Sequence, residues 1–149
     1  MVENVACLRL TNRGMRDSFR VKVSNVAGTD ARELDYESQW IDFPDVRELT
    51  LDRDESALLR IAALNVMDTS VDADRWLELG VSGRHLLRLF KRGGHVDREV
   101  PNDVDVRLKV SVYRGRSDAA PIGSNYRIAI VSNAVWLRRD DATQAIKSG

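Results

Sequence analysis

The chain has 149 residues, 43% of them hydrophobic and 31% charged, and its 23 basic and 23 acidic residues give no net charge. This length suits one domain with a full core, and this composition is that of a folded chain rather than a disordered one. No apolar run reaches the roughly 20 residues that a bilayer span needs, so we expect no transmembrane segment.

The first residues and the single cysteine bear on location. The chain does not open with a basic segment followed by an apolar stretch, so we expect no signal peptide. Cys7 is the only cysteine, which leaves no partner for a disulfide within the chain. These features favour a reducing compartment, and we expect a cytoplasmic protein. We also expect the Cys7 thiol to be buried and inert, as free cysteines commonly are.

Short runs that alternate apolar with polar residues follow one another in the first half of the chain. A period of two places alternate side chains on opposite faces of a strand. The run 57–64 is rich in Ala and Leu, which also favour helix, but it is short and its neighbours are strand-like, so a strand is expected. Polar residues and glycines mark turns or loops between the runs. The predicted strands are 5–10, 19–24, 38–43, 47–51 and 57–64, with a loop at 26–35.

The clearest strand lies in the second half, at 103–115. Valine or leucine stands at every even position from 104 to 112, and charged or polar residues stand between them. One side of this strand suits a core and the other suits water. A turn at 91–94 leads towards this strand, and no strand is expected in between. The other predicted strands are 75–81, 85–90 and 126–130, with long connections at 67–74 and 114–125. Residues 135–137 are expected either to form a last short strand or to pack over an edge of the sandwich.

The order of these elements resembles that of an immunoglobulin-like sandwich. Residues 8–14 (LRLTNRG) followed by 19–23 (FRVKV) are similar to the first hairpin of many microbial domains of this kind. Trp40 falls near the position of a core aromatic residue, and 104–113 with 126–130 resembles the closing hairpin. The paired cysteines of antibody domains are absent. Because this superfold hosts many functions, the resemblance implies only a binding or spacing role.

We therefore predict an all-β fold, an immunoglobulin-like antiparallel β-sandwich of about eight or nine strands. A single domain is expected over residues 1–140, followed by a flexible C-terminal tail at 141–149.

Residues with catalytic or metal-binding chemistry do not form a convincing set. Ser82 lies in a sequence close to a nucleophile elbow, but the second glycine and the following helix are missing. His85, His95 and Cys7 are too few for a structural zinc site. Carboxylates in the 52–55 turn have the spacing of a loop calcium site, yet such residues also favour turns without metal. We expect no enzymatic activity, no cofactor and no metal.

The charges are distributed unevenly along the chain. Residues 25–82 hold 14 acidic and 5 basic residues, a balance of −9, and the remainder holds 9 acidic and 18 basic residues, a balance of +9. This pattern can mark a surface with two poles, unless the strands interleave and mix the charges. The expected interaction surface combines a basic first hairpin with an acidic turn and consists of Arg13, Arg16, Arg20, Lys22, Asp52, Asp54 and Glu55.

The sequence favours a non-enzymatic module that mediates protein–protein interaction within a larger protein or assembly, because complementary charge selects partners. The alternative is a ligand-sensing regulatory domain attached to an effector, since binding sites concentrate on long loops. Nucleic acid is not the expected partner. Arg20 and Lys22 share one strand face, but the chain has no basic excess and no series of exposed aromatic residues for stacking.

Overall fold

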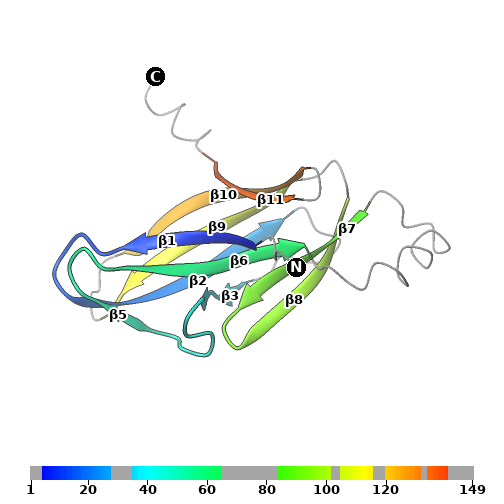
Figure 1. Ribbon diagram of the computed structural model, residues 1–149. Helices are drawn as coiled ribbons and strands as arrows, with labels where there is room; N and C mark the ends of the chain where they lie inside the picture. Colours follow the sequence, from blue (N-terminus) through cyan, green and yellow to red (C-terminus); the bar gives the residue numbers. More distant parts are fainter. Residues whose placement is uncertain are drawn as a thin grey trace, which may run out of the picture.

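A computed structural model describes residues 5–27, 35–64, 84–101, 105–115, 120–131 and 134–140. All regular structure in these residues is β-strand, arranged in two antiparallel sheets (Figure 1). The described part of the chain contains no helix that is long and apolar enough to cross a membrane. The prediction of an all-β sandwich is therefore confirmed.

The first sheet has five strands, and β6 forms its centre. On one side β6 pairs with β1, and on the other side it pairs with the short β4 and then with β7. The hairpin partner of β7 closes the sheet as an edge strand. In spatial order the strands are β1 (Val5–Thr11), β6 (Ser56–Leu64), β7 (Arg84–Lys91) and β8 (Gly94–Pro101), with β4 (Gln39–Trp40) beside β6.

The second sheet has six strands and is built on the predicted central strand. Three strands that are consecutive in the chain form a meander, and the long second strand joins it on the other side. In spatial order they are β11 (Ala134–Arg139), β10 (Ile122–Val131), β9 (Val106–Arg114), β2 (Asp17–Ala27) and β3 (Tyr36–Glu37), with β5 (Leu49–Leu51) also on β2.

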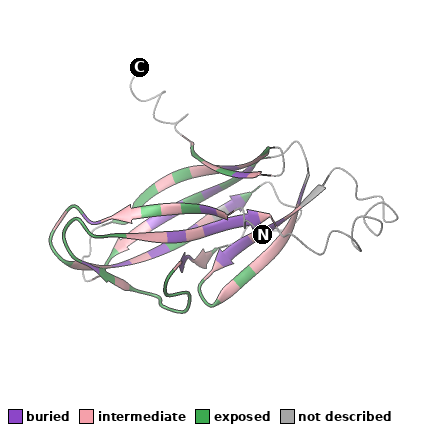
Figure 2. Ribbon diagram, in the orientation of Figure 1, coloured by how far each residue is buried: buried purple, intermediate pink, exposed green. Residues whose placement is uncertain are grey.

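The core lies between the sheets and follows the predicted alternation. Val106, Leu108 and Val110 of β9 are at most 2% exposed, whereas Arg107 and Lys109 between them are exposed. The first sheet contributes fully buried leucines from β6 and β7, and Trp40 of β4 is only 1% exposed. In Figure 2, buried segments follow the middle strands, while the turns near β5 are exposed. The buried apolar surface supplies the main stabilising contribution.

A bulge interrupts the alternation in β6. The partners of β1 step from Ala62 to Arg60 between Ala6 and Cys7, so Ile61 is an extra residue on β6. Ile61 and Ala62 are both buried as a result. Bulges of this kind bend a strand and increase its twist, which helps the first sheet to curve over the second.

The described residues contain eleven strands rather than eight or nine. The predicted strand at 38–43 is replaced by two-residue segments, because the chain passes from β3 in the second sheet to β4 in the first. The predicted connection at 114–125 is shorter, since β10 already begins at Ile122. The predicted strand 57–64 is confirmed as β6, and residues 135–137 form a strand, β11. The predicted strand 75–81, the loop 67–74, the Ser82 turn and the tail 141–149 lie outside the described residues.

The strand β8 was missing from the sequence-based prediction. Its hairpin with β7 turns at Gly93, which has a φ of +78°, a backbone conformation that favours glycine. His95, Asp97 and Glu99 alternate with Val96, Arg98 and Val100 along it. An edge strand tolerates such polar composition because only one of its sides is paired within the sheet.

The predicted first hairpin is wrong in its pairing. β1 pairs with β6 in the first sheet, whereas β2 pairs with β9 in the second. The connection at residues 12–16 therefore carries the chain from one sheet to the other. The expected burial of Cys7 is also wrong: its side chain is exposed. Cys7 follows the bulge on the outward side of an edge strand, opposite Arg60.

Candidate functional site

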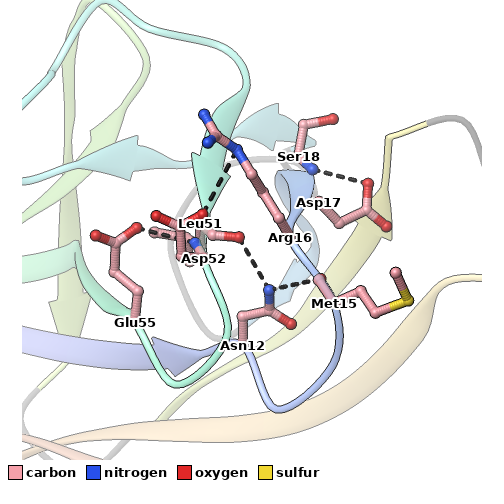
Figure 3. Close-up of polar contacts among 8 residues, drawn as sticks. All are labelled: Asn12, Met15, Arg16, Asp17, Ser18, Leu51, Asp52 and Glu55. Atoms are coloured by element: carbon pink, nitrogen blue, oxygen red, sulfur yellow. Dashed lines mark hydrogen bonds and ion pairs between the residues drawn. The ribbon is translucent and has the colours of Figure 1, made fainter.

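The connection between β1 and β2 is held to the turn between β5 and β6 by Asn12, which is 1% exposed (Figure 3). The Asn12 side-chain amide donates to the carbonyl oxygens of Met15 and Leu51, both at 2.9 Å, and its Oδ1 accepts from the Gly14 N–H at 3.0 Å. The Asn12 backbone bonds to Asp54 and Glu55. A buried amide with this many partners is satisfied and fixes both turns.

The acidic turn and the basic connection of the expected interaction surface pair with each other. Arg13 lies 3.2 Å from Asp54, and Arg16 lies 3.5 Å from Asp52, with all four side chains well exposed. Glu55 accepts a hydrogen bond from the Asp52 backbone N–H at 3.1 Å. These opposite charges are therefore mixed between the two turns, and Figure 3 shows the pair of Arg16 with Asp52. Exposed pairs of this kind contribute little to stability.

The other two predicted surface residues, Arg20 and Lys22, lie elsewhere. Both project from the outer side of β2, where their cationic groups lie 5.3 and 5.7 Å from the centre of the Tyr113 ring of β9. Cations at this distance are attracted by the ring. Arg20 and Lys22 therefore belong to the outer surface of the second sheet rather than to the turn that contains Arg13 and Arg16.

That outer surface is basic across four neighbouring strands. The register of β2, β9, β10 and β11 brings outward positions of each strand side by side. The outward positions of these strands carry no acidic residue. We call this surface the basic face; it consists of Arg20, Lys22, Arg107, Lys109, Arg127 and Arg138 with the aromatic residues Tyr113 and Trp136.

Three arginines of the basic face form a row across adjacent strands. Arg107 of β9 is directly opposite Arg127 of β10, which is directly opposite Arg138 of β11. Directly opposed residues have Cβ atoms about 5 Å apart, and like charges at such positions destabilise a sheet. We call these three residues the arginine row. Trp136 lies two residues before Arg138 on the same side of β11 and is 52% exposed.

The charges of the basic face are only partly neutralised. Arg127, in the middle of the arginine row, lies 3.6 Å from Asp105 and 3.7 Å from Asp140. The other five basic side chains of the face form no ion pair with the described residues. Glu37 is opposite Lys22 in the register, but its carboxylate contacts Arg47 and Arg92, each at 2.7 Å.

The basic face is broad and open. Along β9 it extends from Arg107 to Tyr113, a distance of about 20 Å at about 3.4 Å per residue, and the four strands span about 14 Å at normal spacing. Gly123 of β10 leaves room for the neighbouring Lys109, because a Cβ at Gly123 would lie 2.6 Å from the Lys109 side chain. The Lys109 ammonium group therefore lies low across the sheet instead of standing away from it.

The Cys7 thiol does not have the properties of a reactive cysteine, although it is exposed. Burial of part of the side chain raises the thiol pKa, and the opposing influence of the Arg60 guanidinium is smaller. Nucleophilic cysteines need the thiolate, which a lowered pKa favours. In the described part of the chain, His, Cys, Asp and Glu form no group of three or more that could hold a metal ion.

Sequence reasoning missed most of the basic face. Alternation already placed Arg107, Lys109 and Arg127 on outward sides, and this was the available signal. The positions of these residues relative to Arg138, Arg20 and Lys22 depend on strand order, which alternation does not specify. The basic face with its arginine row exists because the strand order places β11, β10, β9 and β2 side by side.

No protein-family model, no curated protein and no solved structure matches this chain.

Proposed function

We propose that this protein is a non-enzymatic binding module whose basic face docks on an acidic surface of a partner protein, within a larger protein or assembly. The arginine row is the observation that carries the proposal. Three like charges on directly opposed positions weaken the sheet. Asp105 and Asp140 already lie beside the middle arginine, Arg127. An acidic partner would supply carboxylates to Arg107 and Arg138, which form no ion pair with the described residues, so charges that oppose folding would favour binding.

The composition of the basic face supports a protein partner over a nucleic acid. Arginine, tyrosine and tryptophan dominate the residues that contribute most to protein interfaces. Single-stranded nucleic acid needs aromatic rings on which successive bases stack. Arg20 and Lys22 already lie beside the Tyr113 ring, which leaves Trp136 as the more open ring of the face. The chain as a whole also has no net positive charge, unlike a typical nucleic-acid-binding domain.

Electrostatic docking of this kind predicts a strong dependence on salt. Exposed charges are screened over about 8 Å at physiological ionic strength and over about 3 Å at 1 M. Complementary charge mainly raises the association rate and selects the partner. Binding through the basic face should therefore weaken steeply with added salt, and Trp136 would supply apolar contact that salt does not weaken.

The test compares two variants with the same change in net charge. The double substitution Arg107→Gln with Arg138→Gln removes two charges from the arginine row. The control, Arg9→Glu, makes an equal change on an exposed outward position of β1 in the first sheet. Fluorescence anisotropy with a labelled polyglutamate peptide, and with an oligothymidine of the same charge, reports binding at low and high salt.

The proposal expects wild type and Arg9→Glu to bind the peptide at low salt and the double variant to bind at least about tenfold more weakly, a difference of about 1.4 kcal/mol. Equal binding by the double variant and the control would overturn it. Tighter binding of oligothymidine than of the peptide would instead identify a nucleic-acid surface. A pulldown from lysate with the same three proteins, with and without nuclease, then identifies partners that depend on the basic face.

We also propose that the sandwich is of the immunoglobulin-like kind. Two antiparallel sheets and the β9–β10 hairpin support this assignment, whereas the placement of β1 and β2 in different sheets departs from the expected first hairpin. An experimental structure superposed on such domains tests it. A cytoplasmic location is proposed on the exposed free thiol of Cys7, which suits a reducing compartment, and cell fractionation tests that.

A further inference from the structure

An open pocket lies at the end of the sandwich where the chain crosses from β1 to β2. Its volume is about 440 Å³, within the range of pockets that hold small molecules. The wall is mainly apolar and comes from both sheets: Leu10 of β1, Phe19 of β2, Val112 of β9 and Ile122 of β10. The pocket is separate from the basic face, because Phe19 and Val112 point to the inner side of the second sheet, opposite to Arg20 and Tyr113.

Among the described residues that line this pocket, one, Arg114, has a cationic side chain. Its guanidinium carbon lies 6.0 Å from the centre of the Phe19 ring, and a Cβ placed on Gly14 would be 3.5 Å from its Nη2 atom. Arg114 therefore extends from β9 across the mouth of the pocket to the β1–β2 connection. It forms no ion pair with the described residues.

Two described acidic side chains lie beside the neighbouring Gly115, but neither forms an ion pair with Arg114. The Asp17 and Glu48 carboxylates come within 3.1 and 3.3 Å of where a Cβ on Gly115 would be. Asp17 accepts a hydrogen bond from the Ser18 N–H at 2.8 Å. Asn12, the other strongly polar residue of the wall, has its amide hydrogen atoms bonded to Met15 and Leu51. Arg114 is thus the group among the described pocket residues that can still bind an anion.

We propose that this pocket binds a small amphiphilic carboxylate, with its apolar tail against Phe19 and Ile122 and its carboxylate on Arg114. A guanidinium forms two parallel hydrogen bonds with a carboxylate, which gives both affinity and orientation. The apolar wall favours the tail through removal of its surface from water. The large exposed side chain of Ile122, 67% exposed, would be partly covered by the ligand.

Titration calorimetry with decanoate, below its micelle concentration, tests the proposal on the full chain. The neutral analogue decanol measures the contribution of the tail alone. Arg114→Gln removes the charge but keeps hydrogen-bonding groups, and Arg114→Lys keeps the charge. Ile122→Glu places a repelling carboxylate on an exposed position of the pocket wall, where folding tolerates it. The double variant Arg107→Gln with Arg138→Gln controls for decanoate that binds to the basic face.

Wild type should bind decanoate at least about tenfold more tightly than decanol, a difference of about 1.4 kcal/mol. Arg114→Gln should bring decanoate down to the level of decanol, Arg114→Lys should keep part of the preference, and Ile122→Glu should weaken decanoate most. The basic-face control should bind decanoate like wild type. The proposal is overturned if wild type does not bind decanoate, if decanol binds equally well, or if only the basic-face control loses binding.

Discussion

The two sheets are alike on their inner sides and different on their outer sides. Both inner sides consist of alternating buried aliphatic residues, for example Leu59 in β6 and Leu108 in β9. The outer side of the first sheet mixes opposite charges and apolar groups. Arg88 pairs there with Asp97 at 3.1 Å, and Arg60 lies 5.0 Å from the centre of the Phe90 ring. The outer side of the second sheet is the basic face.

This difference shows that the fold constrains the inward residues of its strands much more than the outward ones. Strand alternation places mostly apolar residues at the inward positions, because the two sheets share one core. The outward positions are free to serve another purpose. On the first sheet basic and acidic residues are mixed, and Arg88 is paired with Asp97, whereas on the second sheet the outward positions retain the arginine row despite its repulsion. An unbalanced outer side is therefore the better candidate for function.

Truncation of a buried leucine on the inner side of either sheet should have the largest effect on stability, and the effect should be equal in the two sheets. Leu59→Ala and Leu108→Ala each remove a leucine that is at most 2% exposed. Each should lower the free energy of unfolding by about 2–5 kcal/mol, through lost burial and the cavity that remains. Urea denaturation measures both. A large cost in one sheet and a negligible cost in the other would contradict the view that one core joins them.

Loss of the Asn12 side chain, which links the β1–β2 connection to the turn between β5 and β6, should have the next largest effect on stability. Asn12→Ala removes three side-chain hydrogen bonds and leaves buried carbonyl groups without a donor, which should cost about 1–3 kcal/mol. Arg13→Ala, in the same connection, removes only an exposed ion pair and should cost less than about 1 kcal/mol. Thermal unfolding compares the two. An equal, small effect would show that the connection is not held by the Asn12 amide.

The phenol of Tyr36, on the inner side of the second sheet, should make the stability depend on pH. Its hydroxyl is buried and has no hydrogen-bond partner among the described residues, and burial strongly raises its pKa. The unfolded chain ionises this phenol near pH 10, whereas the folded chain keeps it neutral. Above that pH the unfolded state binds fewer protons, so stability falls by up to about 1.4 kcal/mol per pH unit.

Tyr36→Phe removes this dependence on pH. Denaturation of wild type and variant between about pH 8 and 11 should already show the variant as the more stable protein at the lower end, because it lacks the buried, unpartnered hydroxyl. The advantage of the variant should grow steadily towards the upper end. Parallel curves throughout would mean that the phenol is accessible to water in the folded state.

The smallest expected effect on stability distinguishes the outer sides most directly. The double variant Arg107→Gln with Arg138→Gln relieves the like charges opposed to Arg127, and should stabilise the fold by about 0.2–1 kcal/mol at low salt. Added salt should reduce this gain. Arg9→Glu, opposite Leu58 in the first sheet, should give no comparable gain. Destabilisation by the double variant would mean that the arginine row contributes to the fold itself.

The class of fold and most of the inward residues follow from the pattern of side chains along the chain. Alternation over 57–64 and 103–115 was enough to predict β6 and β9 and their buried sides, because a strand has a period of two whatever its neighbours are. The alternation did not predict edge strand β8, since polar residues interrupt its apolar series. The alternation also did not predict that Arg13 and Arg16 pair with the acidic turn.

Only the tertiary structure decided which outward residues stand together. Arg107, Arg127 and Arg138 belong to three strands, and they form one row because of the register of β9, β10 and β11. The end pocket likewise needs β1 and β2 to lie in different sheets, so that Leu10 and Phe19 form opposite parts of its wall. Strand order and register depend on contacts between distant segments, and a local pattern of side chains carries no information about those contacts.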